Sequence, residues 1–229
     1  MDNMRQEDLQ WVVRRLPKDV KEMMKSLRSN VCLGGGFIRS CITGDPINDL
    51  DLFVDSVDTE KKVVEMLKGI TQKIIRSKNA VTLITHTFPI QIIHRWLYER
   101  PEDVLSDFDF SITCAVVWYD GVMWCGKVHP LYYSDLAAKR LTYLHPNRDE
   151  DVGGSVLRVL KYYRKGYNIT LNSFAGTISR LMSGVRRENE AAITDEDERT
   201  RVLTGLLVEV DPSAVLGSEI VRDNGDEIE

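Results

Sequence analysis

Apolar residues recur at helical spacing through the first part of the chain. The apolar positions between Glu7 and Ser29 lie three or four residues apart, as one face of a helix requires, and Pro17 interrupts them. This pattern predicts two short helices. An apolar strand follows over 30–33 and leads into Gly34-Gly35-Gly36, after which residues 37–43 read as a helix that Gly44 ends. The pattern therefore predicts a strand, a glycine turn and a helix in succession.

Alternating polar and apolar residues come next, at 50–54, and predict a half-buried strand. Because successive side chains of a strand point to opposite faces, Asp49 and Asp51 are expected on one face. Further apolar and amphipathic runs predict a helix over 59–70, strands at 74–75, 81–85, 90–96 and 109–118, and a returning strand over 122–124. Asp120-Gly121 is the predicted hairpin turn between the last two strands.

The remaining chain reads as mainly helical. Helices are predicted at 134–140, 154–165 (with Gly166 as its cap), 172–181 and 200–208. The fold class is therefore α+β, with a mixed β-sheet flanked by helices and followed by a small helical segment. We expect a first domain over 1–146, a helical segment over 147–185 and an acidic C-terminal segment over 186–229.

Charge is distributed unevenly along the 229 residues. Residues 186–229 contain five lysines and arginines against 13 acidic residues, a net charge of −8, which leaves a net charge of +3 for residues 1–185. A mildly basic body with carboxylates concentrated in one place suits a phosphate-rich substrate held through metal ions. The acidic segment is typical of a solubilising or partner-binding extension, so we expect it to lie outside the catalytic unit.

Several classes of protein are disfavoured by the sequence. The apolar runs fall far short of the roughly 20 residues that a membrane-spanning helix needs, and residues 1–7 do not open a signal or transit peptide. The four cysteines and four histidines lie scattered, without the spacing of a zinc site or a disulfide framework. We expect a cytoplasmic protein without a membrane partner.

One stretch carries the candidate chemistry. Glycines between a strand and a helix allow a triphosphate to approach the backbone, where the helix N-terminus attracts its charge, and Arg39 in that helix can reach the same phosphates. The carboxylates of Asp49 and Asp51 can hold Mg²⁺ or Mn²⁺ through oxygen ligands, as metal-assisted phosphoryl transfer requires. The glycine turn and the aspartate pair thus fit one mechanism.

Three ordered motifs carry a family resemblance. The first motif is Gly35-Gly36-Phe37-Ile38-Arg39, which continues through Gly44 and Pro46 to Asp49-Leu50-Asp51. It resembles the signature of class II tRNA nucleotidyltransferases (CCA-adding enzymes) and of bacterial poly(A) polymerases. Both belong to the DNA polymerase beta-like superfamily. The run 109–114 resembles the Asp-Phe-Thr-Ile-Asn-Ala segment that ends the head domain of those enzymes. The run 157–167 is similar to their arginine-bearing neck helix. The resemblance covers roughly residues 31–167.

The resemblance implies a nucleotidyltransferase head followed by a neck. It implies that a nucleoside monophosphate moves from a nucleoside triphosphate to an acceptor hydroxyl, with an RNA 3′ end as the expected acceptor; a protein hydroxyl or a second nucleotide stays open. Asp49 and Asp51 would hold the metal and Asp109 would join them as a catalytic residue, although a structural role for Asp109 is about equally favoured. The expected nucleotide-binding residues are Gly35, Gly36, Arg39, Arg158 and Lys161. For Arg158 and Lys161, a solvated helix face is an equal alternative.

Some positions depart from the family pattern. Ser40 stands where an acidic residue usually follows the motif arginine, and Asp107-Phe108 replaces a pair of arginines. A third carboxylate is not assigned, since Asp107 competes with Gln91 and His94 on the strand that often carries it. We also expect the chain to stop at head plus neck, without domains that grip tRNA. The rival hypothesis is accordingly a non-catalytic protein of this fold that acts as a binding or assembly component.

Overall fold

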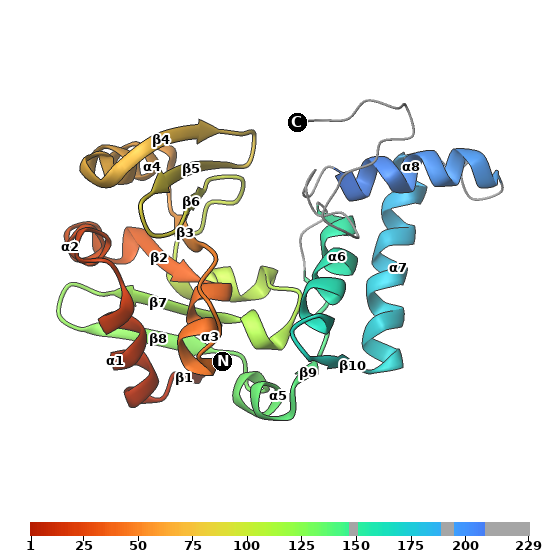
Figure 1. Cartoon of the computed structure of the whole chain (residues 1–229), viewed down its shortest axis with the longest axis horizontal. Coiled ribbons are helices and arrows are strands. Elements are labelled where there is room, and N and C mark those ends of the chain that lie inside the picture. The colour runs from red at the N-terminus through yellow and green to blue at the C-terminus, as the bar shows by residue number, and fades with distance from the viewer. Residues whose placement is uncertain (147–150, 189–194, 209–229) are drawn as a thin grey trace. The chain divides into compact units, whose positions relative to one another are not determined.

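The computed structural model describes residues 1–146, 151–188 and 195–208 (Figure 1). The chain divides into two compact units, Met1–Ala138 and Lys139–Glu229. The domain boundaries expected at 146 and 185 stay predictions, and residues 209–229 of the acidic segment lie outside the described part. None of the helices described is long and apolar enough to cross a bilayer.

Two helices open the first unit, as the apolar spacing predicted. The strand β1 (Asp2–Asn3) precedes α1 (Gln6–Arg15), and α2 (Lys18–Leu27) follows after Pro17. Pro17 lies directly before α2, where its missing N–H costs no helical hydrogen bond. The apolar stripes of both helices are buried, among them Val12 and Val20.

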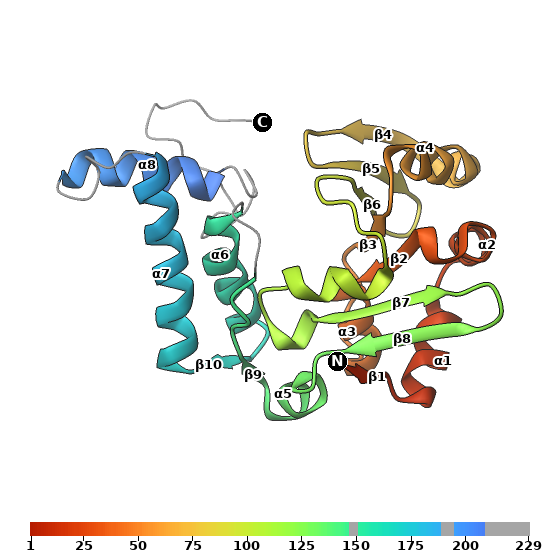
Figure 2. The same ribbon diagram turned by 180° about the vertical axis from the view of Figure 1, so that it is seen from behind.

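A mixed sheet forms the body of this unit. Among the described residues it has eight strands, in the order β1-β8-β7-β2-β3-β6-β5-β4. Its further strands are β2 (Val31–Gly34), β3 (Leu50–Val54), β4 (Thr71–Arg76), β5 (Ala80–Thr85), β6 (Ile90–Ile93), β7 (Ala115–Tyr119) and β8 (Trp124–Val128). The central strand β3 pairs antiparallel with β2 and parallel with β6. Helix α1 lies in front of β7 and β8 in Figure 1 and behind them in Figure 2, so it packs on one face of the sheet.

Helices connect the central strands. The predicted helix after the glycine turn is α3 (Gly36–Thr43), and Gly44 ends it in the left-handed conformation at φ 77°. The next helix, α4 (Val57–Met66), starts two residues before the predicted 59 because the Ser56 side chain caps it, accepting a hydrogen bond from the Thr59 N–H. It also ends earlier, and a 3-10 turn over Lys68–Ile70 completes the predicted range.

Two predictions around β7 and β8 were wrong in extent. The strand expected over 109–118 begins only at Ala115, because the preceding segment folds into a 3-10 turn in which Thr113 N–H donates to Phe110 O at 3.1 Å. The hairpin turn is longer than the predicted two residues, since Asp120 Oδ1 accepts from the N–H groups of both Val122 and Met123 at 2.7 Å. The returning strand therefore starts at Trp124. Helix α5 (Tyr132–Ala138) closes the unit.

The second unit is mainly helical. It contains β9 (Arg140–Leu141) paired with β10 (Asn168–Ile169), and the helices α6 (Val152–Tyr163), α7 (Leu171–Glu188) and α8 (Glu196–Val208). Helix α6 ends two residues before the predicted 165, with Arg164 rather than Gly166 as its C-cap, and Gly166 has φ 82° in the turn that follows. A small core joins the three helices through Val152, Leu181, Val185 and Leu206. The described part of the acidic segment thus contributes Leu206 to this core.

Candidate functional site

The glycine turn brings the chain backbone against a carboxylate. Gly35, between β2 and α3, has φ +73° and ψ −139°, a conformation that only glycine adopts without strain. A Cβ at Gly35 would lie 3.3 Å from Asp51 Oδ2 and 3.5 Å from Phe108 Cε1. The Gly35 N–H itself donates to Ala115 O at 3.3 Å, which fixes the turn to β7. The turn and the Asp51 carboxylate are therefore direct neighbours.

Gly36, the first residue of α3, borders open space. A Cβ at this position would meet no atom within 4 Å, and the residue is half-buried. Backbone N–H groups in the first turn of an α-helix have no partner within the helix and attract anions. The structure thus leaves open space at Gly36 on the side to which a Cβ would point.

Pairing of β2 with β3 explains why the carboxylates lie beside this turn. Gly34 on β2 is the register partner of Asp51 on β3, and Asp49 lies two residues before Asp51. Leu50 and Leu52 are fully buried, whereas Asp49 and Asp51 are half-buried. The alternation predicted from the sequence is therefore observed, and it directs the leucines to the core and leaves both carboxylates accessible to solvent.

Gln91, an amide, stands beside Asp51 on the neighbouring strand. It is the register partner of Asp51 on the parallel strand β6, and its amide supplies a neutral oxygen. The part of the chain that the structure describes contains no group of three or more histidine, cysteine, aspartate or glutamate side chains able to hold a metal ion. Two carboxylates and an amide are nevertheless hard oxygen donors, which suit Mg²⁺ bound jointly by the protein, water and substrate phosphates.

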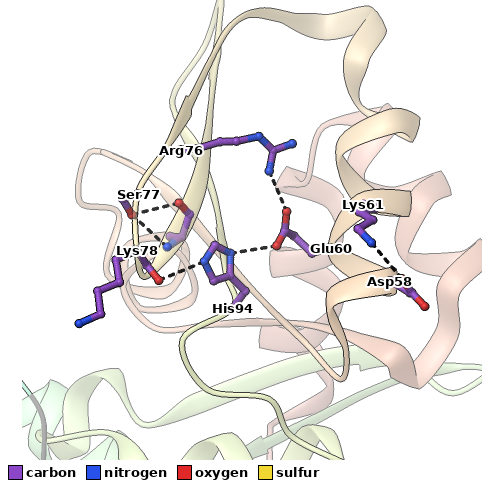
Figure 3. Close-up of polar contacts among 8 residues, drawn as sticks. Asp58, Glu60, Lys61, Arg76, Ser77, Lys78 and His94 are labelled. Atoms are coloured by element: carbon purple, nitrogen blue, oxygen red, sulfur yellow. Dashed lines mark hydrogen bonds and ion pairs between the residues drawn. The ribbon is translucent and has the colours of Figure 1, made fainter.

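His94, a rival for the third position, belongs to a separate network (Figure 3). Its Nδ1 lies 3.0 Å from Glu60 Oε2, and its Nε2 lies 3.2 Å from the Lys78 carbonyl oxygen. Arg76 Nη1 on β4 approaches the other oxygen of the same buried Glu60 at 3.1 Å. The network ties α4 to β4 and to the end of β6. Asp107, the other rival, accepts a hydrogen bond from the Tyr98 hydroxyl at 2.8 Å.

Arg39 lies inside the protein and contacts the loop before β3. Its guanidinium is 2% exposed, donates from Nη2 to Ser40 Oγ at 3.0 Å and lies 3.6 Å from Asp45 Oδ2. Asp45 lies in the loop between α3 and β3, which also contains Asp49. The ion pair therefore connects α3 to this loop. This location supports a role in holding the turn and the carboxylates together; direct contact of Arg39 with phosphate stays a prediction.

Asp109 is buried beside the 3-10 turn before β7. Its side chain is 2% exposed. Burial raises the pKa of the nearby Cys114 thiol to about 12, and the negative charge of Asp109 adds to the increase. Asp109 is thus enclosed by the protein, and its catalytic role stays a prediction.

Sequence reasoning missed an aromatic wall next to Asp51. The Phe53 ring packs edge-on against Phe108 and Tyr98, with centroids 6.0 and 6.1 Å apart. Phe108 also borders the glycine turn. The period-two alternation of β3 already placed Phe53 on the Asp51 face, so half of this wall had a sequence signal. Phe108, the other half of this wall, comes from a segment distant from β3 in the sequence.

The two residues expected on the neck helix lie on α6 of the second unit. Arg158 Nη2 is 2.5 Å from Asp151 Oδ2, and both side chains are largely buried. Lys161 is exposed on the same helix. Arg158 is therefore engaged by a carboxylate of its own unit, whereas the Lys161 ammonium is accessible to an anionic ligand.

The sequence was compared with models of known protein families and with curated proteins. A family model described as "Gabija anti-defense 2 family protein" (Gad2) matches residues 3–139. No curated protein matches the chain.

Solved structures of CCA-adding enzymes are similar. The Thermotoga maritima CCA-adding enzyme complexed with tRNA has a TM-score of 0.58 at 15% identity, over 97% of this chain and 58% of that enzyme. A CCA-adding enzyme in complex with CTP has a TM-score of 0.59 at 17% identity, over 91% and 56%. The chain therefore spans little more than half the length of these enzymes and has the nucleotidyltransferase fold of their head and neck.

Proposed function

The chain belongs to the Gabija anti-defense 2 family, and from this and its nucleotidyltransferase fold we propose that it is a metal-dependent nucleotidyltransferase. It would move a nucleoside monophosphate from a nucleoside triphosphate to an acceptor hydroxyl. The family description further suggests that this activity serves to counteract Gabija defence. The proposed site of action is the cytoplasm.

The observation that carries the proposal is the contact between the glycine turn and Asp51. The Asp51 carboxylate lies 3.3 Å from the Cβ position of Gly35, and the adjoining Gly36 faces open space. A triphosphate seated at Gly36 would meet helix N–H groups on one side and the aspartate pair on the other. The Asp51 carboxylate beside this open space would repel a triphosphate unless a cation lies between them, which favours a metal-dependent site.

Each residue has a defined role in this proposal. Asp49 and Asp51 would hold Mg²⁺ or Mn²⁺, which supplies charge neutralisation for the phosphates and the leaving pyrophosphate. Gly35 keeps the backbone close to Asp51, and Gly36 admits the phosphates. Arg39 and Asp45 would hold α3 and the strand start in register, because their ion pair spans the two segments. Asp109 would complete the site from the 109–114 turn.

An RNA 3′ end is the acceptor we propose. Support comes from the fold, since a similar structure is that of an enzyme complexed with tRNA, and others contain CTP or ATP. Arg158 and Lys161 on α6 would contribute to nucleotide binding, the latter with an exposed ammonium. The acidic C-terminal segment would serve a protein partner.

A second candidate function is supported by Gln91. This amide is the register partner of Asp51, on the strand where members of the superfamily that the chain resembles often carry a third carboxylate. Asp107-Phe108 replaces the pair of arginines of that resemblance, and Phe108 borders the glycine turn. Both replacements lower the charge available to bind metal and phosphate. A non-catalytic binding or assembly component that keeps the fold would tolerate them.

One experiment separates the two functions. Purified protein is incubated with each labelled nucleoside triphosphate in turn, with total RNA and with Mg²⁺ or Mn²⁺, and the products are resolved by electrophoresis. The enzyme proposal predicts label transferred to RNA only in the presence of metal. Label transferred to protein would keep the chemistry and change the acceptor. A folded protein that is inert with every nucleotide, acceptor and metal would favour the binding component.

A further inference from the structure

A polar pocket lies within the second unit, formed by residues that the proposed transfer site does not include. Its volume is about 520 Å³, and it opens between the segment around 143–146 and one face of α7. Its polar lining consists of Tyr143, His145, Ser179, Arg180, Ser183 and Arg186. All belong to the unit Lys139–Glu229.

Small residues on α7 keep this pocket open. A Cβ at Gly176 would approach Tyr143 Cδ1 to 2.8 Å and His145 Cε1 to 2.9 Å, so only glycine lets the two rings pack this closely on the helix. Ser179 and Ser183 continue the same face one and two turns on, where a larger side chain would fill the hollow. The pocket is therefore a consequence of three specific small residues.

The opposite wall is built from a turn with an unusual backbone. His145 has φ +52°, in the left-handed region that side chains other than glycine rarely adopt. Its ring packs edge-on against Tyr143 with centroids 4.6 Å apart. Arg180 Nη1 donates to the carbonyl oxygen of Pro146 at 3.1 Å and so fixes its guanidinium to this turn. The turn and α7 thus hold the pocket in a defined shape.

Positive charge dominates the lining. The described residues that line the pocket include two arginines and a histidine, and none of these described residues is an aspartate or a glutamate. The Ser183 hydroxyl donates to Ser179 O at 3.0 Å, so the arginines supply the N–H donors for an anionic ligand. Arginine is the residue best suited to phosphate, which it binds through paired N–H groups. The charge of the pocket therefore favours a phosphate-bearing ligand.

We propose that this pocket binds a nucleotide through its phosphate. A volume of about 520 Å³ lies in the range of sites for small organic molecules and is far larger than a single inorganic anion requires. The exposed face of His145 offers a ring on which a base can stack. The nucleotide can be free or one unit of an RNA chain, since both present the same phosphate and base.

The test measures binding to the full-length protein in EDTA. Without divalent metal, triphosphate binding at the aspartate pair is suppressed, so binding measured in EDTA reports on this pocket alone. A negative result here would therefore leave the proposed transfer activity untouched, and the reverse also holds. The probes are a fluorescently labelled oligoribonucleotide, followed by anisotropy, and AMP, used as competitor and in titration calorimetry. Competition by AMP would identify a pocket for a free nucleotide, and binding of the oligoribonucleotide alone would identify an RNA subsite.

Two variants address the pocket itself. Arg186→Gln removes an exposed charge, and Ser183→Leu fills the hollow without changing charge; we expect each to raise the Kd at least about tenfold. Their matched controls on α8 are Arg201→Gln and Thr204→Leu, the latter losing the same type of hydroxyl-to-carbonyl bond, to Thr200 O. The controls should bind as the wild type does. Absence of binding by both probes, or equal Kd values for pocket and control variants, would overturn the proposal.

Discussion

Replacement of Gly36 by valine tests the phosphate position without disturbing the fold. A Cβ at Gly36 meets no atom within 4 Å, and the residue opens α3 with an ordinary helical backbone. Valine is a slightly better helix former than glycine, so the free energy of unfolding should change by less than about 0.5 kcal/mol. The added methyl groups would instead project into the space that we assign to the phosphates.

The loss of affinity follows from the bonds that valine would block. Hydrogen bonds between backbone N–H groups and a charged phosphate contribute about 1.5–3 kcal/mol each. Loss of even one such bond raises the Kd at least about tenfold, which corresponds to about 1.4 kcal/mol. We therefore expect Gly36→Val to bind nucleoside triphosphate in Mg²⁺ at least about tenfold more weakly than the wild type.

Titration calorimetry with each nucleoside triphosphate in Mg²⁺ measures this change, and thermal unfolding verifies the fold. Gly69→Val is the matched control, because a Cβ at Gly69 also meets nothing within 4 Å and the residue lies in the 3-10 turn after α4. The control should retain the affinity of the wild type. A folded Gly36→Val protein with unchanged affinity would refute the assignment of the phosphate site.

Three further changes test the stability of the glycine turn, of the Glu60 network and of the helical unit. Gly35→Ala should lower the free energy of unfolding by about 1–3 kcal/mol in urea titrations, because φ +73° is strained for alanine; a loss below about 0.5 kcal/mol would contradict the strain. Glu60→Ala should lower the free energy of unfolding by about 1–2 kcal/mol in thermal scans, less than for a fully buried pair because Arg76 is 59% exposed. An unchanged Tm would show that the Glu60 network is not stabilising. Deletion of 196–229 should destabilise the helical unit by about 1–3 kcal/mol, since it uncovers the apolar surface beneath Leu206; hydrogen exchange of α6 and α7 that stays as slow as in the wild type would speak against it.

The glycine turn and the aspartate pair were predictable because their signals are local. A short apolar strand, three glycines and a helix ended by Gly44 read directly from adjacent residues, and the alternation over 50–54 places Asp51 on the polar side of β3. Their proximity in space then follows from pairing of β2 with β3, in which Gly34 and Asp51 are partners. Resemblance to a known family supplied the link between the two.

Features that depend on distant contacts were not predictable in the same way. The turn over 111–113 has strand-like residues, yet local hydrogen bonds to Phe110 and Ser111 make it a 3-10 turn. Phe108 reaches the glycine turn only through the fold, so its part in the aromatic wall had no sequence signal. The pocket on α7 likewise needs Gly176 to face the ring of His145, a pairing of residues far apart in the chain.

The central claim is that Asp49 and Asp51 hold the metal for nucleotidyl transfer. Its most direct test compares the wild type with the double variant Asp49→Asn, Asp51→Asn in the labelled transfer assay, at matched metal concentration and with thermal unfolding as the measure of folding. Asparagine keeps the size and hydrogen bonding of aspartate but removes two negative charges, so we predict metal-dependent transfer by the wild type and none above background by the folded double variant. Comparable transfer by both proteins would contradict the account.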